Sequence, residues 1–314
     1  MTVVPEGQLV YGMQLPIQSQ SKTFVEDWEH SADVDELVSI ARHADRTGFF
    51  YVAVCDHVGV PAGPHADHMG TTWYDTVATL SMLAGVTENV RLMSSVYVVA
   101  YRHPLQTAKA WMTLDRLSGG RAILGVGAGH LQAEFETFGI PYDERGAITN
   151  DAIDAIRAAF HDEFPSFGSG RFTDGTLGLG PRPTQANIPI WIGGRGKPAL
   201  RRVAERGDGW IPQGTPRNEM AGEIDYILEH RKRVREGEPL DLGFLAEPMY
   251  VGSPTWEVGP RTITGPPALL AERTREMRAL GINHVQIRLR SRSVEELQDQ
   301  MTAWHEEVAP LLNG

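Results

Sequence analysis

Residues 89–130 constrain the fold more than any other part of the chain. They contain a β-rich run at Arg91–Val98, an amphipathic stretch that begins at Pro104 and ends at Gly119-Gly120, and a second β-rich run at Arg121–Val126. Two consecutive strands joined by a helix lie parallel, because tight turns join only antiparallel strands. The segment therefore predicts a parallel α/β fold.

The same alternation continues along the chain. We expect strands at Leu9–Gln14, Phe49–Val54, Arg91–Val98, Arg121–Val126, Ile190–Ile192, Gly209–Ile211, within Leu240–Val251, and at His284–Arg290. Apolar residues recur at helical spacing between these strands. Eight strands alternating with helices favour one (β/α)8 TIM barrel over residues 1–314 rather than a doubly wound sheet. Residues 162–188 lack a helical period and predict an insertion with a hairpin, and residues 252–267 predict a loop.

Composition narrows the class of protein. The 314 residues carry a formal net charge of −11, which argues against binding to nucleic acid or to an anionic membrane surface. Cys55 is the single cysteine, so an intramolecular disulfide is excluded and a reducing compartment is expected. The sequence has no window as apolar as a membrane helix and no evident signal peptide. We therefore expect a soluble cytoplasmic protein.

In a (β/α)8 barrel, ligands bind at the carboxyl ends of the strands. Asp56-His57 follows the second strand, where it predicts either ligand contact and proton transfer or a helix cap beside a surface histidine. Ser95-Val96 lies in the third strand, where small residues would admit a flat ring or simply fill the core. The glycines of Gly125–His130 end the fourth strand and allow close approach of a ligand, or tight packing at a barrel corner.

The fifth strand ends in Gly193-Gly194-Arg195-Gly196-Lys197, directly before a helix. Backbone N–H groups at a helix N-terminus, together with two cations, predict a phosphate site; the alternative is a glycine turn with solvated charges. The segment is not a Walker motif, because Pro198 follows Lys197. The histidines lack the spacing of metal ligands, so no metal is expected.

Two groups of residues bear on the substrate. An aromatic, mostly apolar pocket would form if Met13, Gln14, Trp73, Tyr74, Tyr97 and Tyr101 converge, although core packing explains the same residues. Arg288 and Arg290 on the eighth strand would bind an anion or form salt bridges, and the sequence does not decide between the two.

Several segments resemble the luciferase-like monooxygenase superfamily of flavin- and deazaflavin-dependent oxidoreductases. The matching segments are 101–104, 114–121, 125–129, 138–141, 143–146, 190–194 and 207–210. The resemblance spans nearly the whole chain and implies a TIM barrel with an insertion. The chain looks most like the branch that uses coenzyme F420.

The resemblance assigns a role to most strand-end residues. Asp56 would contact and orient the cofactor ring, and His57 would handle a proton. Ser95-Val96 matches a pair that is often joined by a cis peptide behind the deazaflavin, with Val98 also beside the cofactor. The backbone of Ala128-Gly129 would touch the cofactor, and the phosphate tail would lie against Gly193, Gly194, Arg195, Gly196 and Lys197.

One position departs from the branch. Its sugar-phosphate dehydrogenase carries a glutamate directly after the glycine cluster, whereas this chain has His130. Oxidation of glucose 6-phosphate is therefore not expected, and His130 becomes a second candidate for proton transfer.

The expected function is hydride transfer between coenzyme F420 and an unidentified small organic substrate. Two alternatives remain open from the sequence. One is an FMN-dependent luciferase-like monooxygenase, and the other is a flavin-binding barrel without catalytic turnover. Family membership also implies a homodimer.

Overall fold

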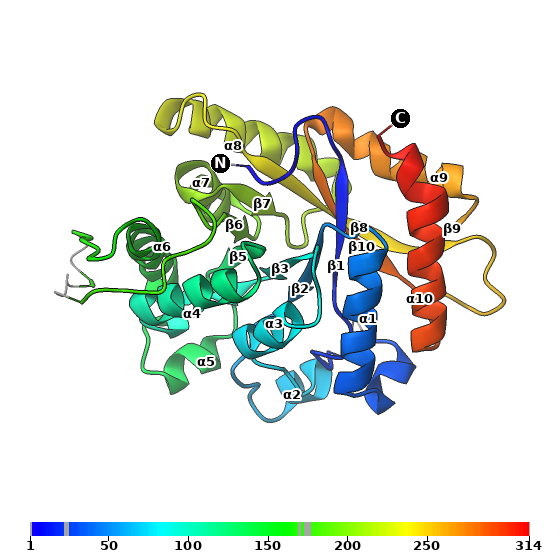
Figure 1. Ribbon diagram of the computed structural model, residues 1–314, viewed down its shortest axis with the longest axis horizontal. Helices are drawn as coiled ribbons and strands as arrows, with labels where there is room; N and C mark the ends of the chain where they lie inside the picture. Colours follow the sequence, from blue (N-terminus) through cyan, green and yellow to red (C-terminus); the bar gives the residue numbers. More distant parts are fainter. Residues whose placement is uncertain (1, 22–24, 169–170, 173–176, 314) are drawn as a thin grey trace.

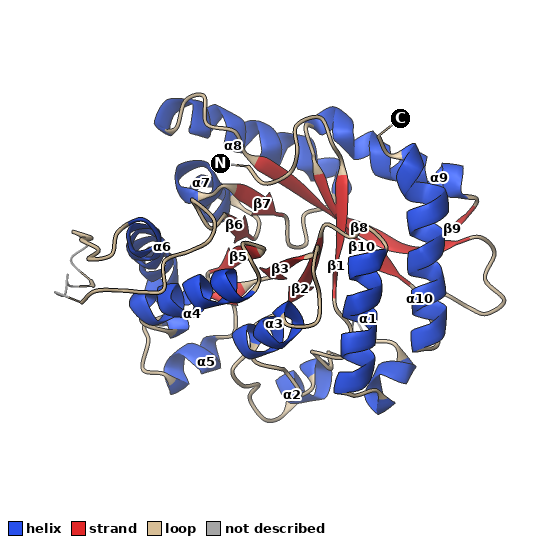
Figure 2. Ribbon diagram, viewed as in Figure 1, coloured by secondary structure: helices blue, strands red, loops and turns tan. Residues whose placement is uncertain are grey.

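The structure is a computed structural model that describes residues 2–21, 25–168, 171–172 and 177–313. Its centre is a ring of parallel strands surrounded by helices (Figure 1; Figure 2). Eight strands close the ring, because β10 pairs with both β1 and β8. The (β/α)8 barrel predicted from the sequence is confirmed.

The elements have the following bounds. The strands are β1 Val10–Gln14, β2 Tyr51–Val54, β3 Arg91–Ser94, β4 Tyr97–Val98, β5 Ala122–Gly127, β6 Ile190–Gly193, β7 Gly209–Ile211, β8 Asp241–Val251, β9 Ile263–Gly265 and β10 His284–Leu289. The helices are α1 Val34–Arg46, α2 Pro64–Met69, α3 Thr76–Ala84, α4 Pro104–Leu117, α5 Gln132–Thr137, α6 Arg145–His161, α7 Lys197–Arg206, α8 Met220–Val234, α9 Pro267–Arg275 and α10 Val294–Ala303.

Three local predictions are corrected. The strand expected at Arg91–Val98 is interrupted after Ser94, where the Ser95–Val96 peptide is cis, and it resumes as β4. The loop expected at 252–267 contains the short strand β9, which pairs with β8. The described residues of 162–188 form no strand, and Arg182 holds this segment against the end of α6 through the carbonyls of Ala159, Phe160 and Asp162. Residues 169–170 and 173–176 of the predicted insertion lie outside the described residues.

Large rings fill the interior of the barrel. Tyr51, Trp191 and His284 pack together there, and the Trp191 and His284 rings stack with centroids 4.1 Å apart. Gly12 and Gly209 leave room for these rings, since a Cβ at either position would overlap Tyr51 or Trp191. The ring of strands is therefore a packed core, and space for a ligand lies beyond the strand ends.

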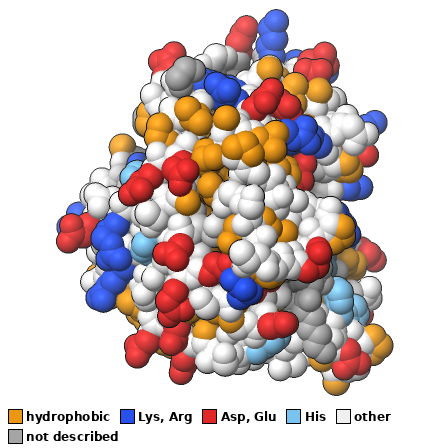
Figure 3. All heavy atoms as spheres, turned by 90° about the vertical axis from the view of Figure 1, so that its right-hand side faces the viewer, with side chains coloured by type: hydrophobic (Ala, Val, Ile, Leu, Met, Phe, Trp, Pro, Cys, Tyr) orange, Lys and Arg blue, Asp and Glu red, His pale blue; other side chains and the backbone are white. Residues whose placement is uncertain are grey.

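The helices cover the outside of the ring with their apolar faces. In α1, for example, Leu37, Ile40 and Ala44 are buried, while Asp33 and Glu36 form a capping box that fixes where the helix begins. On the side of α9 and α10, acidic and basic side chains are interspersed over the surface (Figure 3). None of the helices in the described part of the chain combines the length and the apolarity needed to cross a bilayer.

Candidate active site

A cavity of about 1120 Å³ lies at the carboxyl ends of the strands. It brings together most of the residues that the sequence singled out, although they come from four different strand ends. Those that line it are Asp56, His57, Ser95, Val96, Val98, Ala128, Gly129, His130, Gly193, Gly194 and Arg195. Gly196 and Lys197 are exposed and are not among the lining residues; the Gly196 N–H points to the Glu223 carboxylate at 3.4 Å.

His57 is held by a buried glutamate that the sequence analysis missed. Its Nδ1 lies 2.9 Å from Glu134 Oε2, which also accepts a hydrogen bond from the Tyr101 hydroxyl at 3.0 Å. Glu134 Oε1 accepts from the N–H groups of Val58 at 2.8 Å and Gly59 at 3.2 Å. The carboxylate on α5 thereby anchors both the His57 ring and the loop that follows it.

The charge of Glu134 determines which nitrogen of His57 carries the hydrogen. Burial alone would raise the Glu134 pKa, but the hydrogen bond and charge of His57, with the two loop N–H groups, hold that pKa below its usual value. An ionised carboxylate only accepts hydrogen bonds, so Nδ1 of His57 must be the donor. In the neutral ring Nε2 then keeps its lone pair and is available as a proton acceptor.

Two further rings surround His57. The Trp73 ring lies 4.5 Å from it and the His130 ring 5.4 Å, both measured between centroids. Partial burial, the charge of His57 and that of His65 lower the pKa of His130, while Glu134 opposes them. His130 is therefore biased toward its neutral form.

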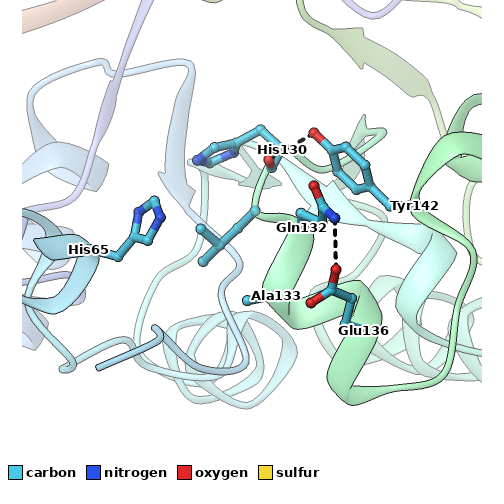
Figure 4. A pocket seen from close by; sticks show the side chains of 7 residues that line it. His65, His130, Gln132, Ala133, Glu136 and Tyr142 are labelled. Atoms are coloured by element: carbon cyan, nitrogen blue, oxygen red, sulfur yellow. Dashed lines mark hydrogen bonds between the residues drawn. The ribbon is translucent and has the colours of Figure 1, made fainter. Parts of the chain in front are cut away.

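His130 also lines a smaller cavity of about 400 Å³. Figure 4 shows His65 of α2 and the His130 ring on facing sides of this space. The Tyr142 hydroxyl donates to the His130 carbonyl at 3.1 Å and steadies the backbone there. His130 thus stands where the two cavities adjoin.

Asp56 lines the cavity, and its carboxylate is paired with an arginine. Its carboxylate accepts two hydrogen bonds from Arg102, at 2.7 and 2.8 Å, and one from the Val98 N–H at 2.9 Å. The Arg102 guanidinium also lies 4.2 Å from the centroid of the Tyr97 ring. Asp56 therefore ties the end of β2 to the backbone after the cis peptide, and its contact with a cofactor stays a prediction.

The glycines of β5 and β6 make room for Val96. A Cβ at Gly127 or Gly193 would overlap the Val96 side chain. Ser94 joins β3 to β5 at the same level, because its hydroxyl donates to the Gly125 carbonyl at 2.8 Å and accepts from the Gly125 N–H at 3.0 Å. Val96 and the glycine strand ends together form a smooth surface on this side of the cavity.

A buried arginine lies at the same end of the cavity. Arg202 on α7 is 5% exposed, lines the cavity, and donates to Asn150 Oδ1 and to the Gly146 carbonyl. Within the described ranges it forms no ion pair with a carboxylate. Burial, and the nearby charge of Arg206, lower the pKa of Arg202 to about 10, so it stays protonated at neutral pH. Glu205 acts against this lowering but makes no direct ion pair with Arg202 among the described residues, and a buried cation without a direct carboxylate partner favours an anionic ligand.

Arg202 belongs to no motif of the sequence, and its role depends on α6, which holds its guanidinium group; its spacing from Pro198 is the one local signal. Pro198, Ala199 and Arg202 all line the cavity, as residues three and four apart on one helix face do. Arg145 and the exposed Arg195 border the same space. Arginines from α6 and α7 therefore border the cavity beside the glycines at the end of β6.

The residues that bear on the substrate divide into two groups. Met13, Gln14, Trp73 and Tyr101 line the cavity, whereas Tyr74 and Tyr97 pack in the hydrophobic core. Arg290 Nε lies 2.6 Å from Glu26 Oε1, and Arg288 lies 3.6 Å from the same oxygen. Of the two roles that the sequence left open for Arg288 and Arg290, anion binding or salt bridges, the structure shows salt bridges to Glu26. In the part of the chain that the structure describes, no three His, Cys, Asp or Glu side chains converge as metal ligands would.

A closed parallel barrel with histidines, glycine strand ends and a buried cation around one cavity is a small-molecule-binding TIM barrel. Residues 13–254 match the family described as "Luciferase-like monooxygenase", and the chain belongs to this family of oxidoreductases and monooxygenases.

Known relatives differ in their stated cofactor and reaction. The chain is 32% identical over 189 residues to an F420-dependent hydroxymycolic acid dehydrogenase of Mycobacterium tuberculosis, covering 59% of this chain and 51% of that protein. Among solved structures, a monooxygenase of Streptomyces bottropensis superposes with a TM-score of 0.77 at 19% identity, covering 96% of this chain and 99% of the other. A coenzyme F420-dependent tetrahydromethanopterin reductase of Methanopyrus kandleri gives 0.75 at 17% identity, with coverage of 96% and 99%. At these identities the two structures show a shared fold.

Proposed function

We propose that this protein is an F420-dependent oxidoreductase that transfers a hydride between the deazaflavin and a small organic substrate. The observation that carries the proposal is the placement of the His57–Glu134 pair in the same cavity as Arg202 and the glycine strand ends. A proton-transfer group and an anion-binding end are what a phosphate-bearing redox cofactor requires of its site. The relative named as an F420-dependent dehydrogenase supports the choice of cofactor.

The residues present fit such a cofactor. Arg202 is a buried cation without a carboxylate partner among the described residues, and it would hold the cofactor phosphate with the Gly194 and Arg195 backbone. Gly127 and Gly193 leave the strand ends without side chains, so a planar ring could approach Val96 closely. A bound deazaflavin supplies two-electron hydride exchange.

The other residues position groups and move a proton. Glu134 fixes His57 with its hydrogen on Nδ1, so Nε2 takes a proton from the substrate or returns one to it. Asp56 and Arg102 hold the backbone beside the Ser95–Val96 peptide in place. Trp73 packs against the His57 ring and helps to exclude water from it.

Fluorescence titration of the purified protein with coenzyme F420 and with FMN tests the proposal. We expect deazaflavin to bind at micromolar concentration or below, and Arg202→Ala to weaken this binding roughly 10- to 100-fold through loss of a charge-assisted contact. Arg201→Ala is the matched control, because Arg201 is the exposed neighbour on the same helix. Absence of deazaflavin binding would refute the proposal.

An FMN-dependent monooxygenase is the second candidate, favoured by the structural likeness to the Streptomyces monooxygenase. Oxygen consumption with reduced FMN distinguishes it, because a deazaflavin enzyme does not activate oxygen readily. Binding of either cofactor without turnover of any substrate would instead favour the non-catalytic barrel.

A further inference from the structure

The cavity is large for a small-molecule site. Its volume of about 1120 Å³ exceeds the roughly 300–1,000 Å³ of pockets that hold a single small molecule. In the ring of strands β10 lies opposite β5, since three strands lie between them in either direction. The side of β8, β10 and β1 therefore faces the glycine end across the same cavity, and it offers space for a second molecule beside the cofactor that the proposed function places there.

The lining on that side contains a group of apolar side chains, interspersed with polar ones such as Gln14, Gln286 and Ser291. We name it the apolar wall, and it consists of Met13, Leu15, Val25, Trp28, Leu245, Pro248, Leu289 and Leu297. Met13 and Leu289 are buried on the adjacent strands β1 and β10. The Trp28 indole N–H donates to the Ser291 hydroxyl at 3.2 Å, which leaves the ring itself as apolar surface.

The charges beside the apolar wall compensate one another. Glu26 pairs with Arg290 at 2.6 Å and with Arg288 at 3.6 Å. Glu29 accepts hydrogen bonds from the N–H groups of Ile17 at 2.8 Å and Glu26 at 2.9 Å. Glu26 occupies both guanidinium groups and backbone N–H groups occupy Glu29, so an ionised ligand would be buried here without a free counter-charge, which is costly.

We propose that the apolar wall binds the substrate of the proposed oxidoreductase, and that this substrate has an uncharged alkyl or aryl body. The inference rests on the proposed function for the identity of the cofactor, but its binding surface is separate from the anion-binding end. It excludes sugar phosphates and other anions as the group seated on this side.

A homologous series of neutral probes tests the inference. The protein is titrated by calorimetry with hexanol, octanol and decanol, in buffer with inorganic phosphate so that an anion already occupies the Arg202 end. Each added methylene buried against the wall should tighten binding roughly three- to fourfold. Decanoate, with the same chain and a charge, should bind at least about tenfold more weakly than decanol. A flat series, or decanoate binding as tightly as decanol, would overturn the inference.

A pair of tryptophan variants locates the binding. Trp28→Ala should weaken decanol binding roughly tenfold and leave the deazaflavin affinity unchanged. Trp256→Ala is the matched control, because Trp256 does not line the cavity and its indole N–H donates to Glu296. Urea unfolding of both variants verifies that they fold.

An equal loss of deazaflavin affinity in Trp28→Ala would place the wall in the cofactor site and contradict the inference. Alcohol binding without deazaflavin binding would refute the proposed function alone, whereas deazaflavin binding with a flat alcohol series would refute this inference alone.

Discussion

Replacing Glu134 with glutamine should disturb the candidate site in two measurable ways. The carboxylate is 4% exposed and accepts four hydrogen bonds, from His57, Tyr101, Val58 and Gly59. A hydrogen bond to a charged acceptor is stronger than one to a neutral acceptor by about 1 kcal/mol, so the four together set an upper limit near 4 kcal/mol. We expect the free energy of unfolding to fall by about 2–4 kcal/mol.

The same substitution should reverse the tautomer of His57. If the glutamine oxygen still accepts the hydrogen bonds from the Val58 and Gly59 N–H groups, the glutamine NH2 group faces His57 Nδ1. Because an NH2 group donates, Nδ1 must then become the acceptor. The hydrogen then moves to Nε2, which loses its lone pair. The ¹⁵N resonances of the histidine rings distinguish the two tautomers directly.

Urea unfolding and ¹⁵N spectroscopy of the variant and a control provide the assay. Glu136→Gln is the control, because Glu136 lies on the same short helix and its carboxylate accepts an exposed hydrogen bond from the Gln132 amide. Its stability should change by no more than about 0.5 kcal/mol. Equal stability of the two variants, with an unchanged His57 tautomer, would refute the reasoning.

Three further predictions concern stability. Arg102→Ala leaves the buried Asp56 carboxylate without its bidentate partner and should lower the free energy of unfolding in urea by about 2–4 kcal/mol, and no loss would contradict the ion pair's role. Gly127→Ala places a Cβ against Val96 and should lower the free energy of unfolding by about 1–3 kcal/mol in the same assay. An unchanged free energy would show that Val96 can move aside without cost. Burial lowers the pKa of His284 to about 3, so below pH 6.5 the unfolded chain binds a proton that the folded chain does not. This group should therefore lower the free energy of unfolding by up to about 1.4 kcal/mol per pH unit as the pH drops from 6.5 toward 3. In His284→Phe the free energy of unfolding should depend less steeply on pH. Equal slopes in the two proteins would show that the His284 pKa is not lowered in the folded state.

The ring of strands could be predicted because each strand carries its own signal. Buried runs such as Ile190–Ile192 and Phe49–Val54 are apolar throughout, and amphipathic helices separate them. The short helices α2 and α5 were missed, since six residues are too few to show a helical period. The break after Ser94 was also not visible as a strand boundary, because β-rich residues continue on both sides of it.

The site could be predicted only where its residues follow a strand. His57, Gly129 and Gly193 do so, and the barrel brings them to one cavity. Glu134 and Arg202 were missed because their importance depends on packing between distant segments. His57 and Glu134 are 77 residues apart in sequence, and their contact exists only once the strand ends have been assembled. The cytoplasmic location and the homodimer stay predictions.

A crystal structure of the protein with coenzyme F420 bound tests the central claim most directly. The account predicts cofactor density in the large cavity at the strand ends, with the phosphate in contact with Arg202 and the ring on the side of His57 and Val96. Density at another place on the barrel, or a cofactor turned so that its phosphate lies against the apolar wall, would contradict it.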